Sequence, residues 1–519
     1  MQAFAALLDG LTFTRSRTAK LRLMGAYLRA TPDPDRGWAL AALTGTLDLK
    51  AVQPSLLKAL MADRVDPVLF SLSHDFVGDM AETISLLWPG SGAGAPPALA
   101  EVVDMLTGLS RAEAPAVVAS LLDRLDAPGR YAVIKLATGA LRAGVSARLA
   151  KTAFAEAFGL DVEAVEEVWH GLAPPFAPLF AWGEGRAPQP QAGDLPVFRP
   201  FMLAGRLEAE PLDLNDYAAE WKWDGIRVQL VHAGGQTRLF SRSGDDITAS
   251  FPDVAGALTV PAALDGELLV RGDAQCGAAS FNALQQRLGR KAPGPKLLAE
   301  APAFVRLYDL LALDGEDLRP QPWAARRAAL ETLLPRLDAS RFDLSPLVAA
   351  ADWPALAALR DGARDAAIEG LMLKRRDAAY VAGRRAGLWF KWKRAPLTAD
   401  CVMMYAQRGH GKRSSLFSDF TFGVWGADGT LLPVGKAYSG ISDAELALLD
   451  KWVRTHTTAR FGPVREVEKL LVLEVAFDAI HPSRRHKSGL AMRFPRIHRI
   501  RTDKPAHEAD TIAGLLALT

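Results

Sequence analysis

The chain has 519 residues, of which 49% are hydrophobic and 23% are charged, and its formal net charge at pH 7 is only +2. A chain of this length is too long to fold around a single hydrophobic core, so we expect two to four domains. The composition excludes a disordered chain, and no apolar run approaches the length of a transmembrane helix. The near-neutral net charge identifies no class of partner until the distribution of the charges is known.

The cysteines and the N-terminus indicate where the protein resides. Cys276 and Cys401 lie far apart and have no metal-ligand spacing, which is typical of the reducing cytosol. The N-terminal "AFAALL" is short, follows no basic residue and is soon interrupted by Asp9, so it is a poor signal peptide. We therefore expect a cytoplasmic protein.

Residues 1–185 predict an all-α N-terminal domain. In "SARLAKTAFAEAFG", for example, Ser146 is a suitable helix N-cap and Gly159 can end the helix. The Gly- and Pro-rich residues 186–199 lack periodicity and predict a linker.

Residues 200–395 have a different texture and predict an α+β domain. Apolar and polar residues alternate on both sides of Gly234 and Gly235, which indicates a β-hairpin. Further strand-like runs follow, with the helical pattern "WAARRAALETLLPRL" between them.

Residues 396–519 predict short strands and turns, interrupted by the helical segment "SDAELALLDKWVRTH". A domain of this size and texture favours a small β-barrel of the OB-fold type. The predicted fold is therefore multidomain: an all-α domain, an α+β domain and a C-terminal β-barrel.

The stretch "EWKWDGIR" places Lys222 at the start of a predicted strand, two residues before Asp-Gly. Taken alone, such a lysine is more often a solvated surface charge than a functional group. The motifs that follow Lys222 favour a functional role instead. In chain order they are "SRSG", "LDGELL", "LYDLL", "EGLMLK" and "WFKWK".

In "WFKWK" the two lysines, Lys391 and Lys393, alternate with aromatic residues and share one face of a strand. Several cations gathered around one ligand would repel one another unless the ligand is a polyphosphate. Glu267 and Glu369 could then hold the Mg²⁺ that such a ligand carries.

This ordered set resembles the nucleotidyltransferase motifs of the ATP-dependent DNA ligases. "KWDG" from Lys222, with Arg227, resembles the nucleophile motif, and "RFPRIHRIRTDK" at 493–504 resembles the last ligase motif. "LRAGVS" at 141–146 is similar to a signature of the ligase DNA-binding domain. The resemblance covers nearly the whole chain, is strongest over 196–504, and is closest to bacterial ligases with an N-terminal helical DNA-binding domain.

The resemblance implies that Lys222 is the catalytic nucleophile and that ATP donates AMP to it, with Mg²⁺ or Mn²⁺ as the metal. A lysine is protonated at neutral pH and must lose a proton before it attacks. The neighbouring lysines, the metal and partial burial by Trp221 and Trp223 would favour the neutral amine.

The remaining ligand-binding residues follow from the same resemblance. Glu220 would recognise the adenine amino group and Tyr308 would stack on the base, whereas Glu267 and Glu369 would bind the metal. The full set expected to bind ATP or AMP comprises Glu220, Arg227, Arg242, Glu267, Tyr308, Lys374, Arg385, Lys391, Lys393, Arg501 and Lys504.

The basic residues are concentrated near the C-terminus and predict contacts with a phosphate backbone, although a basic run alone is often a solvated face. The glycine-containing "QRGHGKRSS" loop and "LRAGVS" add further candidates. The expected DNA-binding residues are Arg142, Gly144, Arg408, Lys412, Arg484, Arg485, Lys487 and Arg493.

The resemblance therefore predicts a DNA ligase that seals nicks in duplex DNA, acts as a monomer that encircles DNA, and is associated with the nucleoid through it. An RNA ligase or an RNA-capping guanylyltransferase is the nearest alternative, because both share the Lys-x-Asp-Gly nucleophile. A non-catalytic DNA-binding protein is a more remote one. The helical N-terminal segment and the motif at 493–504 argue against the first two, and the intact motifs argue against the third.

Overall fold

The structure is a computed structural model. It describes residues 1–47, 49, 52–90, 95–191, 195–207, 212–272, 277–279, 284, 287–288, 290, 292–363, 367–409, 415–483 and 486–518. Contacts within the chain divide it into two units, one formed by Met1–Val145 with Ala395–Thr519 and the other by Ser146–Arg394.

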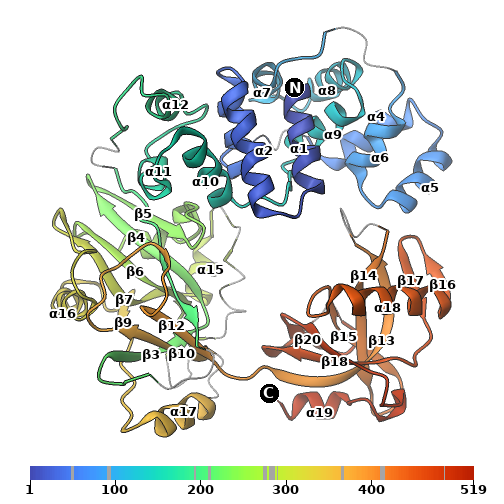
Figure 1. The fold of residues 1–519 in the computed structure, drawn as a ribbon. Coiled ribbons are helices and arrows are strands. Elements are labelled where there is room, and N and C mark those ends of the chain that lie inside the picture. The colour runs from blue at the N-terminus through green and yellow to red at the C-terminus, as the bar shows by residue number, and fades with distance from the viewer. Residues whose placement is uncertain are drawn as a thin grey trace. The chain divides into compact units, whose positions relative to one another are not determined.

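The N-terminal residues are helical, as the sequence predicts (Figure 1). The helices are α1 (Gln2–Phe13), α2 (Arg17–Ala30), α3 (Asp35–Thr44), α4 (Pro54–Ala62), α5 (Pro67–Val77), α6 (Met80–Leu87), α7 (Leu99–Leu106), α8 (Ala114–Asp123), α9 (Ala127–Ala137), α10 (Ala147–Phe158), α11 (Val162–Trp169) and α12 (Ala177–Gly183). The Ser146 side chain accepts a hydrogen bond from the Leu149 N–H at 3.2 Å, and α10 ends at Gly159 with φ of 68°. Both predicted ends of this helix are confirmed.

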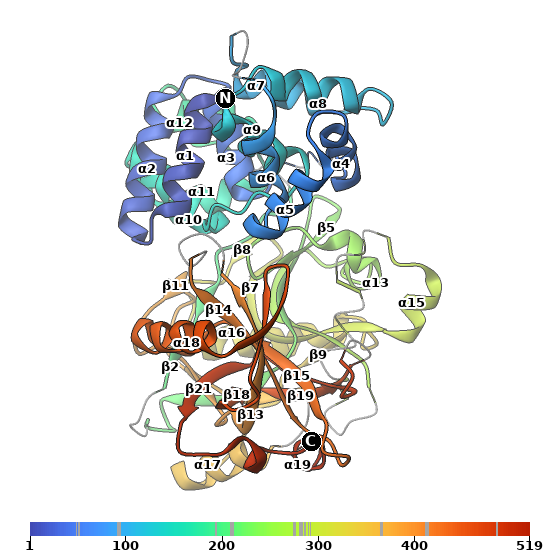
Figure 2. The ribbon, with the colours of Figure 1, turned by 90° about the vertical axis from the view of Figure 1, so that its right-hand side faces the viewer.

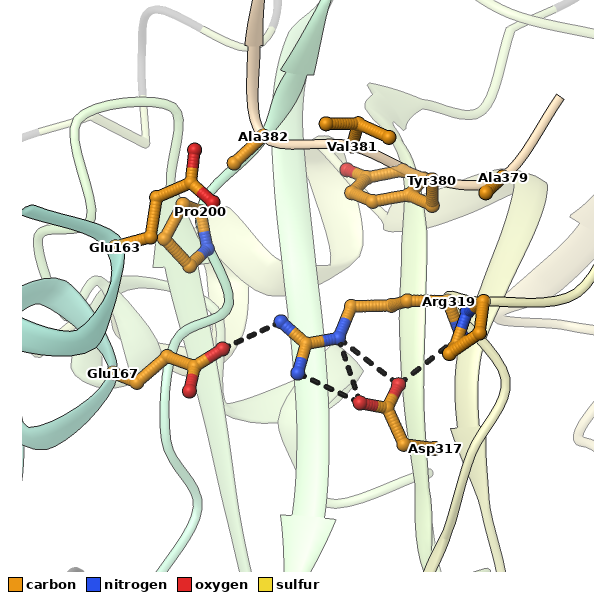
Figure 3. Close-up of a pocket in the computed structure, with 10 residues that line it drawn as sticks. Glu163, Glu167, Pro200, Asp317, Arg319, Ala379, Tyr380, Val381 and Ala382 are labelled. Atoms are coloured by element: carbon orange, nitrogen blue, oxygen red, sulfur yellow. Dashed lines mark hydrogen bonds and ion pairs between the residues drawn. The ribbon is translucent and has the colours of Figure 1, made fainter. Parts of the chain in front are cut away.

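Helices α10 to α12 belong by their contacts to the unit that ends at Arg394. One link is Arg319, which donates to Glu167 of α11 at 2.6 Å and to Asp317 at 2.7 Å. These three side chains line a pocket of about 280 Å³, in which the guanidinium of Arg319 is neutralised by the two carboxylates (Figure 3). The predicted domain boundary at residue 185 stays a prediction.

The described part of the unit Ser146–Arg394 contains two mainly antiparallel sheets and a two-stranded parallel sheet, formed by the first and eleventh strands. Its strands are β1 (Met202–Leu203), β2 (Gly205–Arg206), β3 (Tyr217–Trp223), β4 (Ile226–Ala233), β5 (Gln236–Ser241), β6 (Ala262–Val270), β7 (Ala303–Leu313), β8 (Glu316–Asp317), β9 (Phe342–Leu344), β10 (Ile368–Arg375), β11 (Gly383–Arg384) and β12 (Trp389–Lys393). Its further helices are α13 (Pro252–Ala255), α15 (Pro295–Glu300), α16 (Trp323–Leu333) and α17 (Trp353–Gly362), with short 3₁₀ turns at Thr248–Ser250 and Leu334–Arg336.

One sheet has the strand order β2-β12-β10-β3, and the other has the order β5-β4-β6-β7-β8, with β9 also paired to β7. The predicted hairpin is confirmed: Ala233 pairs with Gln236, and Gly234 and Gly235 have φ of 53° and 72°. Positive φ at both positions is what a two-residue hairpin turn of this kind requires. Because β3 and β4 are consecutive, the short turn between them connects the two sheets.

The C-terminal region consists of strands and one long helix, which Figure 2 shows from the side. Its elements are β13 (Leu397–Arg408), β14 (Phe417–Trp425), β15 (Leu431–Ala437), α18 (Asp443–Thr455), β16 (Thr457–Phe461), β17 (Val464–Val467), β18 (Val472–Phe477), β19 (Ala479–Pro482), β20 (Leu490–Arg493), β21 (Arg496–Arg501), a 3₁₀ turn (Ala506–Glu508) and α19 (Ile512–Leu516). The predicted helical insert is confirmed as α18, which begins with a capping box between Ser442 and Glu445.

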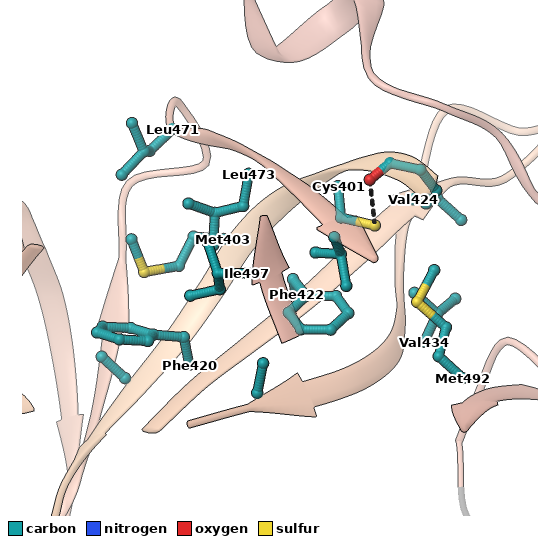
Figure 4. Close-up of a cluster of buried hydrophobic side chains, with 14 of the residues drawn as sticks. Cys401, Met403, Phe420, Phe422, Val424, Val434, Leu471, Leu473, Met492 and Ile497 are labelled. Atoms are coloured by element: carbon teal, nitrogen blue, oxygen red, sulfur yellow. Dashed lines mark hydrogen bonds between the residues drawn. The ribbon is translucent and has the colours of Figure 1, made fainter. Parts of the chain in front are cut away.

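The core of this region is an apolar cluster between the strands and α18. Alternate residues of β13 and β14, such as Cys401, Met403, Phe420 and Phe422, are fully buried within it (Figure 4). Their spacing of two follows from the alternation of side chains along a strand. The cluster gives the C-terminal region a hydrophobic core of its own.

In the described part of the C-terminal region the strands form no closed barrel, which corrects that part of the predicted fold. Among the described strands the main path is β15-β14-β13-β17-β16, with β18 joining β13 to β21. Over the residues that the structure describes, β19 and β20 pair with each other and this path does not return to β15. The sheet stays open because, within the described residues, the outer edge of β15 bonds no further strand.

Within the described residues, no helix is both long and apolar enough to cross a membrane.

His170 provides a test of the packing between the helices and the sheet. Burial lowers the pKa of its imidazole from 6.5 to about 3, and the rings of Phe198 and Phe240 lie 5.7 and 4.7 Å away. An unfolded chain binds this proton below pH 6.5 while the folded one does not. Acidification from pH 7 to pH 5 therefore disfavours folding at this site by about 2 kcal/mol.

We expect His170→Phe to lessen the loss of unfolding free energy between pH 7 and pH 5 by about 2 kcal/mol. The variant keeps an aromatic ring in the same aromatic surroundings but cannot bind a proton. Urea unfolding followed by tryptophan fluorescence at the two pH values measures the difference. An identical pH dependence in both proteins would contradict the buried neutral histidine.

Candidate active site

The strand register brings the predicted lysines together. Lys222 of β3 pairs with Gly370 of β10, and Gly370 pairs in turn with Lys393 of β12. Glu220 and Lys391 occupy the neighbouring row, two residues along β3 and β12. Side chains two apart in a strand share a face. The prediction that Lys391 and Lys393 share one face agrees with this register, which also places Lys222 in the same row as Lys393.

A β-bulge positions the first carboxylate. The register shifts between Ile368 and Gly370, and Gly370 has φ of 147°. A Cβ at this glycine would lie 2.4 Å from the Trp392 carbonyl oxygen, so no other residue fits. The bulge leaves the neighbouring Glu369 side chain in contact with the Lys222 ammonium.

Glu369 is thereby shared between two cations. It forms an ion pair with Lys222 and a second one with Lys393, at 2.9 Å. Burial by itself raises the pKa of Glu369, but the two ammonium groups outweigh it and hold the pKa below its usual value. The carboxylate is therefore ionised and available to a cation.

The turn after Lys222 positions the second carboxylate. The Gly225 N–H donates to Glu267 Oε1 at 3.2 Å, and a Cβ on Gly225 would lie 2.4 Å from the Leu268 carbonyl oxygen. Burial raises the pKa of Glu267 to about 7, opposed by Lys222 and Arg227. The negative charge of Glu369 adds to the increase. A bound cation would stabilise the ionised form of Glu267 and so lower its pKa again.

Arg227 follows the turn along the chain, and hydrogen bonds fix its guanidinium. It donates two hydrogen bonds to Asp265, at 3.1 and 2.7 Å, and one to the Tyr380 hydroxyl at 3.2 Å. The Tyr380 hydroxyl donates to Asp265 at 2.7 Å. The guanidinium lies 5.9 Å from the Tyr308 ring. Sequence reasoning missed Asp265 and Tyr380, although Asp265 stands within the "LDGELL" motif.

Glu220, Lys374 and Tyr308 form a buried group. Lys374 Nζ donates to Glu220 at 3.1 Å and to the Tyr308 carbonyl oxygen at 3.3 Å, and it lies 4.4 Å from the Tyr308 ring. Burial lowers the pKa of Lys374, which Glu220 partly offsets. A second cation, Arg327 of α16, lies 3.8 Å from Glu220. Arg327 was missed because only the fold brings α16 to β3.

Trp221 and Trp223 do not lie where the sequence argument placed them. They line a groove of about 1130 Å³ together with Ala355 and Ala358 of α17. Since side chains alternate along β3, this groove is on the face opposite Lys222. The expectation that these tryptophans partly bury the lysine is therefore wrong.

Arg242 and Arg385 are both exposed. Arg242 is near enough to Lys391 for its charge to contribute to lowering the pKa of that lysine, after burial and Arg384. Arg385 lies 3.9 Å from Glu163 of α11. Their assignment to the nucleotide stays a prediction.

Arg501 and Lys504 lie in the other unit, at the end of β21 and in the turn after it. Both bind Asp400 of β13: Arg501 Nη1 at 3.0 and 3.2 Å, and Lys504 Nζ at 2.9 Å. Arg501 also donates to Asp503 at 2.9 Å. Asp400 was not singled out from the sequence, where a hundred residues separate it from its partners.

The predicted DNA-binding residues differ in their surroundings. Arg142 and Lys487 are exposed, whereas Arg408 and Arg493 are half-buried beside aromatic rings. Gly144 has φ of 61°, and its carbonyl oxygen accepts a hydrogen bond from Lys20 at 2.6 Å. Three of the predicted residues lie outside the described ones: Lys412, Arg484 and Arg485.

No group of three or more His, Cys, Asp or Glu side chains in the described part of the chain is arranged to hold a metal ion. Glu267 and Glu369 remain as a pair of carboxylates beside Lys222, each in electrostatic contact with the other. Mg²⁺ at phosphate-transfer sites is commonly held by one or two carboxylates together with phosphate oxygens. The pair fits such a site.

A lysine set among further cations and two carboxylates is suited to nucleotidyl transfer. Residues 202–393 match the family model described as "ATP dependent DNA ligase domain", and residues 413–504 match "ATP dependent DNA ligase C terminal region".

Curated relatives agree with the family models. The chain is 36% identical over 425 residues to a "Probable DNA ligase" of Koribacter versatilis, covering 75% of this chain and 72% of the relative. It is 34% identical to a "DNA ligase" of Methanoculleus marisnigri, covering 75% and 70%. The solved structure titled "Pmar-Lig_Pre." has a similar fold, with a TM-score of 0.58 over 96% of this chain and 99% of that one, at 16% identity. The chain belongs to the family of ATP-dependent DNA ligases and is a ligase enzyme.

The buried pair of Glu220 and Lys374 can be tested by a double-mutant cycle. Lys374→Met leaves a buried carboxylate with only the more distant Arg327, so we expect it to lower the unfolding free energy by about 3–5 kcal/mol. Adding Glu220→Gln removes that charge and should recover part of the loss. Urea unfolding of the four proteins measures the coupling. Strictly additive effects of the two changes would contradict a direct interaction.

Proposed function

We propose that this ligase seals nicks in duplex DNA through a covalent intermediate on Lys222. The observation that carries the proposal is the placement of Lys222 by the register of β3, β10 and β12 beside Glu369 and Lys393, with Lys391 in the adjacent row. Family membership supports ATP as the source of the nucleotide.

In the first step the neutral Lys222 amine attacks the α-phosphorus of ATP. A P–N bond forms, the bond to the pyrophosphate oxygen breaks, and the nitrogen releases a proton. Lys391 and Lys393 neutralise the charge that develops on the α-phosphate, because fixed cations stabilise such charge without reorganising. Before this step Lys222 must leave its ion pair with Glu369.

Glu267 and Glu369 are the residues that would hold Mg²⁺ in this scheme, and the metal would neutralise charge on the phosphates. Glu220 would accept a hydrogen bond from the adenine amino group, and Tyr308 would pack on the base. Arg227, fixed by Asp265 and Tyr380, would contact the ribose or phosphate region of the nucleotide. Arg242 and Arg385 would contact phosphate groups as exposed cations.

In the second step an oxygen of the DNA 5′-phosphate attacks the adenylate, and the P–N bond to Lys222 breaks. In the third, the 3′-hydroxyl attacks the activated 5′-phosphate and AMP leaves. The protein is proposed to act as a monomer that encircles the duplex, with an OB-like C-terminal region. The exposed Arg142 and Lys487, with Arg408 and Arg493, would contact the DNA backbone without reading sequence.

Lys222→Ala is expected to abolish the transfer of label from α-³²P-ATP to the protein, because no other amine occupies its position. The measurement is incubation with Mg²⁺ followed by a denaturing gel, after bound AMP has been removed with pyrophosphate. Lys296→Ala is the matched control, since Lys296 is an exposed lysine of the same unit whose ion pair is with Glu300.

Nicked duplex DNA should discharge the label from the wild-type protein and yield a sealed strand. Discharge by nicked RNA but not by nicked DNA would assign an RNA ligase instead, and labelling by GTP would assign a capping enzyme. Persistence of the label in Lys222→Ala would refute the proposed nucleophile.

A further inference from the structure

Asp400 holds two cations that come from elsewhere in the sequence. Its Oδ2 accepts a hydrogen bond from Lys504 Nζ at 2.9 Å and another from Arg501 Nη1 at 3.0 Å. Both cations therefore meet at one carboxylate oxygen. All three side chains are largely buried, with exposed fractions of 13% for Asp400, 18% for Arg501 and 21% for Lys504.

The backbone of Asp400 is fixed independently of these contacts. Its N–H donates to Asp510 Oδ2 at 2.9 Å, and its carbonyl oxygen accepts from the Asp510 N–H at 2.9 Å. Asp400 also pairs in register with Glu474 of β18, the strand that carries β21 and Arg501 on its other edge. The carboxylate is thus a rigid element of the sheet and not a mobile surface charge.

A rigid carboxylate stabilises two neighbouring cations against their mutual repulsion. Free arginine and lysine side chains repel each other and each loses about 2 kcal/mol of rotamer entropy when ordered. Asp400 offsets the repulsion and keeps the guanidinium and the ammonium adjacent before any ligand arrives. Two cations held at one carboxylate oxygen are adjacent, and both can bind the anionic oxygens of a polyphosphate.

We propose that Asp400 is a positioning residue for the adenylylation of Lys222. It presents Arg501 and Lys504 as a preassembled pair of cations to the departing pyrophosphate. The inference rests on the proposed function and adds to it that Arg501 and Lys504, which the family resemblance assigns to ATP binding, orient the pyrophosphate leaving group. Asp400 acts through them and does not contact the nucleotide itself.

The position of this pair predicts which kinetic constant changes. Most residues expected to bind the nucleotide belong to the other unit, so loss of Asp400 should leave the KM for ATP nearly unchanged. The maximal rate of Lys222 adenylylation should fall by about 10- to 100-fold in Asp400→Asn, the effect expected from misplaced charged groups. Sealing of a nick that already carries the 5′-adenylate releases no pyrophosphate, and its rate should stay within about twofold.

The experiment compares both reactions in the full chain, using labelled ATP for adenylylation and a synthetic 5′-adenylylated nick for sealing. Asp419→Asn is the matched control, because Asp419 is a largely buried strand carboxylate of the same sheet that pairs with Lys436 at 2.6 Å. This control should change neither rate. Asp400→Glu restores a carboxylate one methylene further out and should recover part of the adenylylation rate.

The outcomes separate this inference from the function on which it rests. If Arg501→Ala and Lys504→Ala adenylylate Lys222 at the wild-type rate, the proposed role of the pair is wrong. If these two variants are slow but Asp400→Asn is not, only the role of Asp400 is overturned. Equal loss of both reactions in Asp400→Asn would show a general effect on folding, and faster adenylylation would show that Asp400 masks the cations. Either result overturns the proposal.

Discussion

The contact between Glu369 and Lys222 determines how the site is built, and it depends on one backbone feature. The bulge at Gly370 requires a positive φ and a backbone approach too close for any Cβ. It moves Glu369 out of the regular alternation of β10 and against the ammonium groups of β3 and β12. Without the bulge, Glu369 and Lys222 would not face each other, and the two neighbouring lysines would have no shared counter-charge.

The second constraint is the turn that follows Lys222. Because β3 and β4 belong to different sheets, the chain must cross between them within two residues, and Gly225 fits where a side chain would strike the Leu268 carbonyl oxygen. The same glycine N–H binds Glu267, so the crossing point also fixes the second carboxylate. The Asp-Gly after the lysine is thus a structural requirement of the sheet connection as well as part of a motif.

Strand periodicity and turn chemistry predicted much of this from the sequence. The hairpin at Gly234 and Gly235 and the helix from Ser146 to Gly159 depend on local backbone preferences, and both were predicted correctly. Contacts between distant segments were not predictable in this way, which is why Asp265 was missed. The closed barrel was also wrong, because the pairing of strand edges, such as that of β13 with β17 and β18, joins segments far apart in the sequence and is encoded by no local pattern.

One arrangement of charge recurs in the two units. Glu369 is shared by Lys222 and Lys393, and Asp400 is shared by Arg501 and Lys504. In each case the partners come from different elements, and the carboxylate is held by the backbone of a strand. Partly buried cations that await an anionic ligand need a counter-charge in its absence, since an unpaired charge there is costly. A carboxylate on a rigid strand supplies that charge and keeps the cations next to each other, where phosphate oxygens can replace it as their partner.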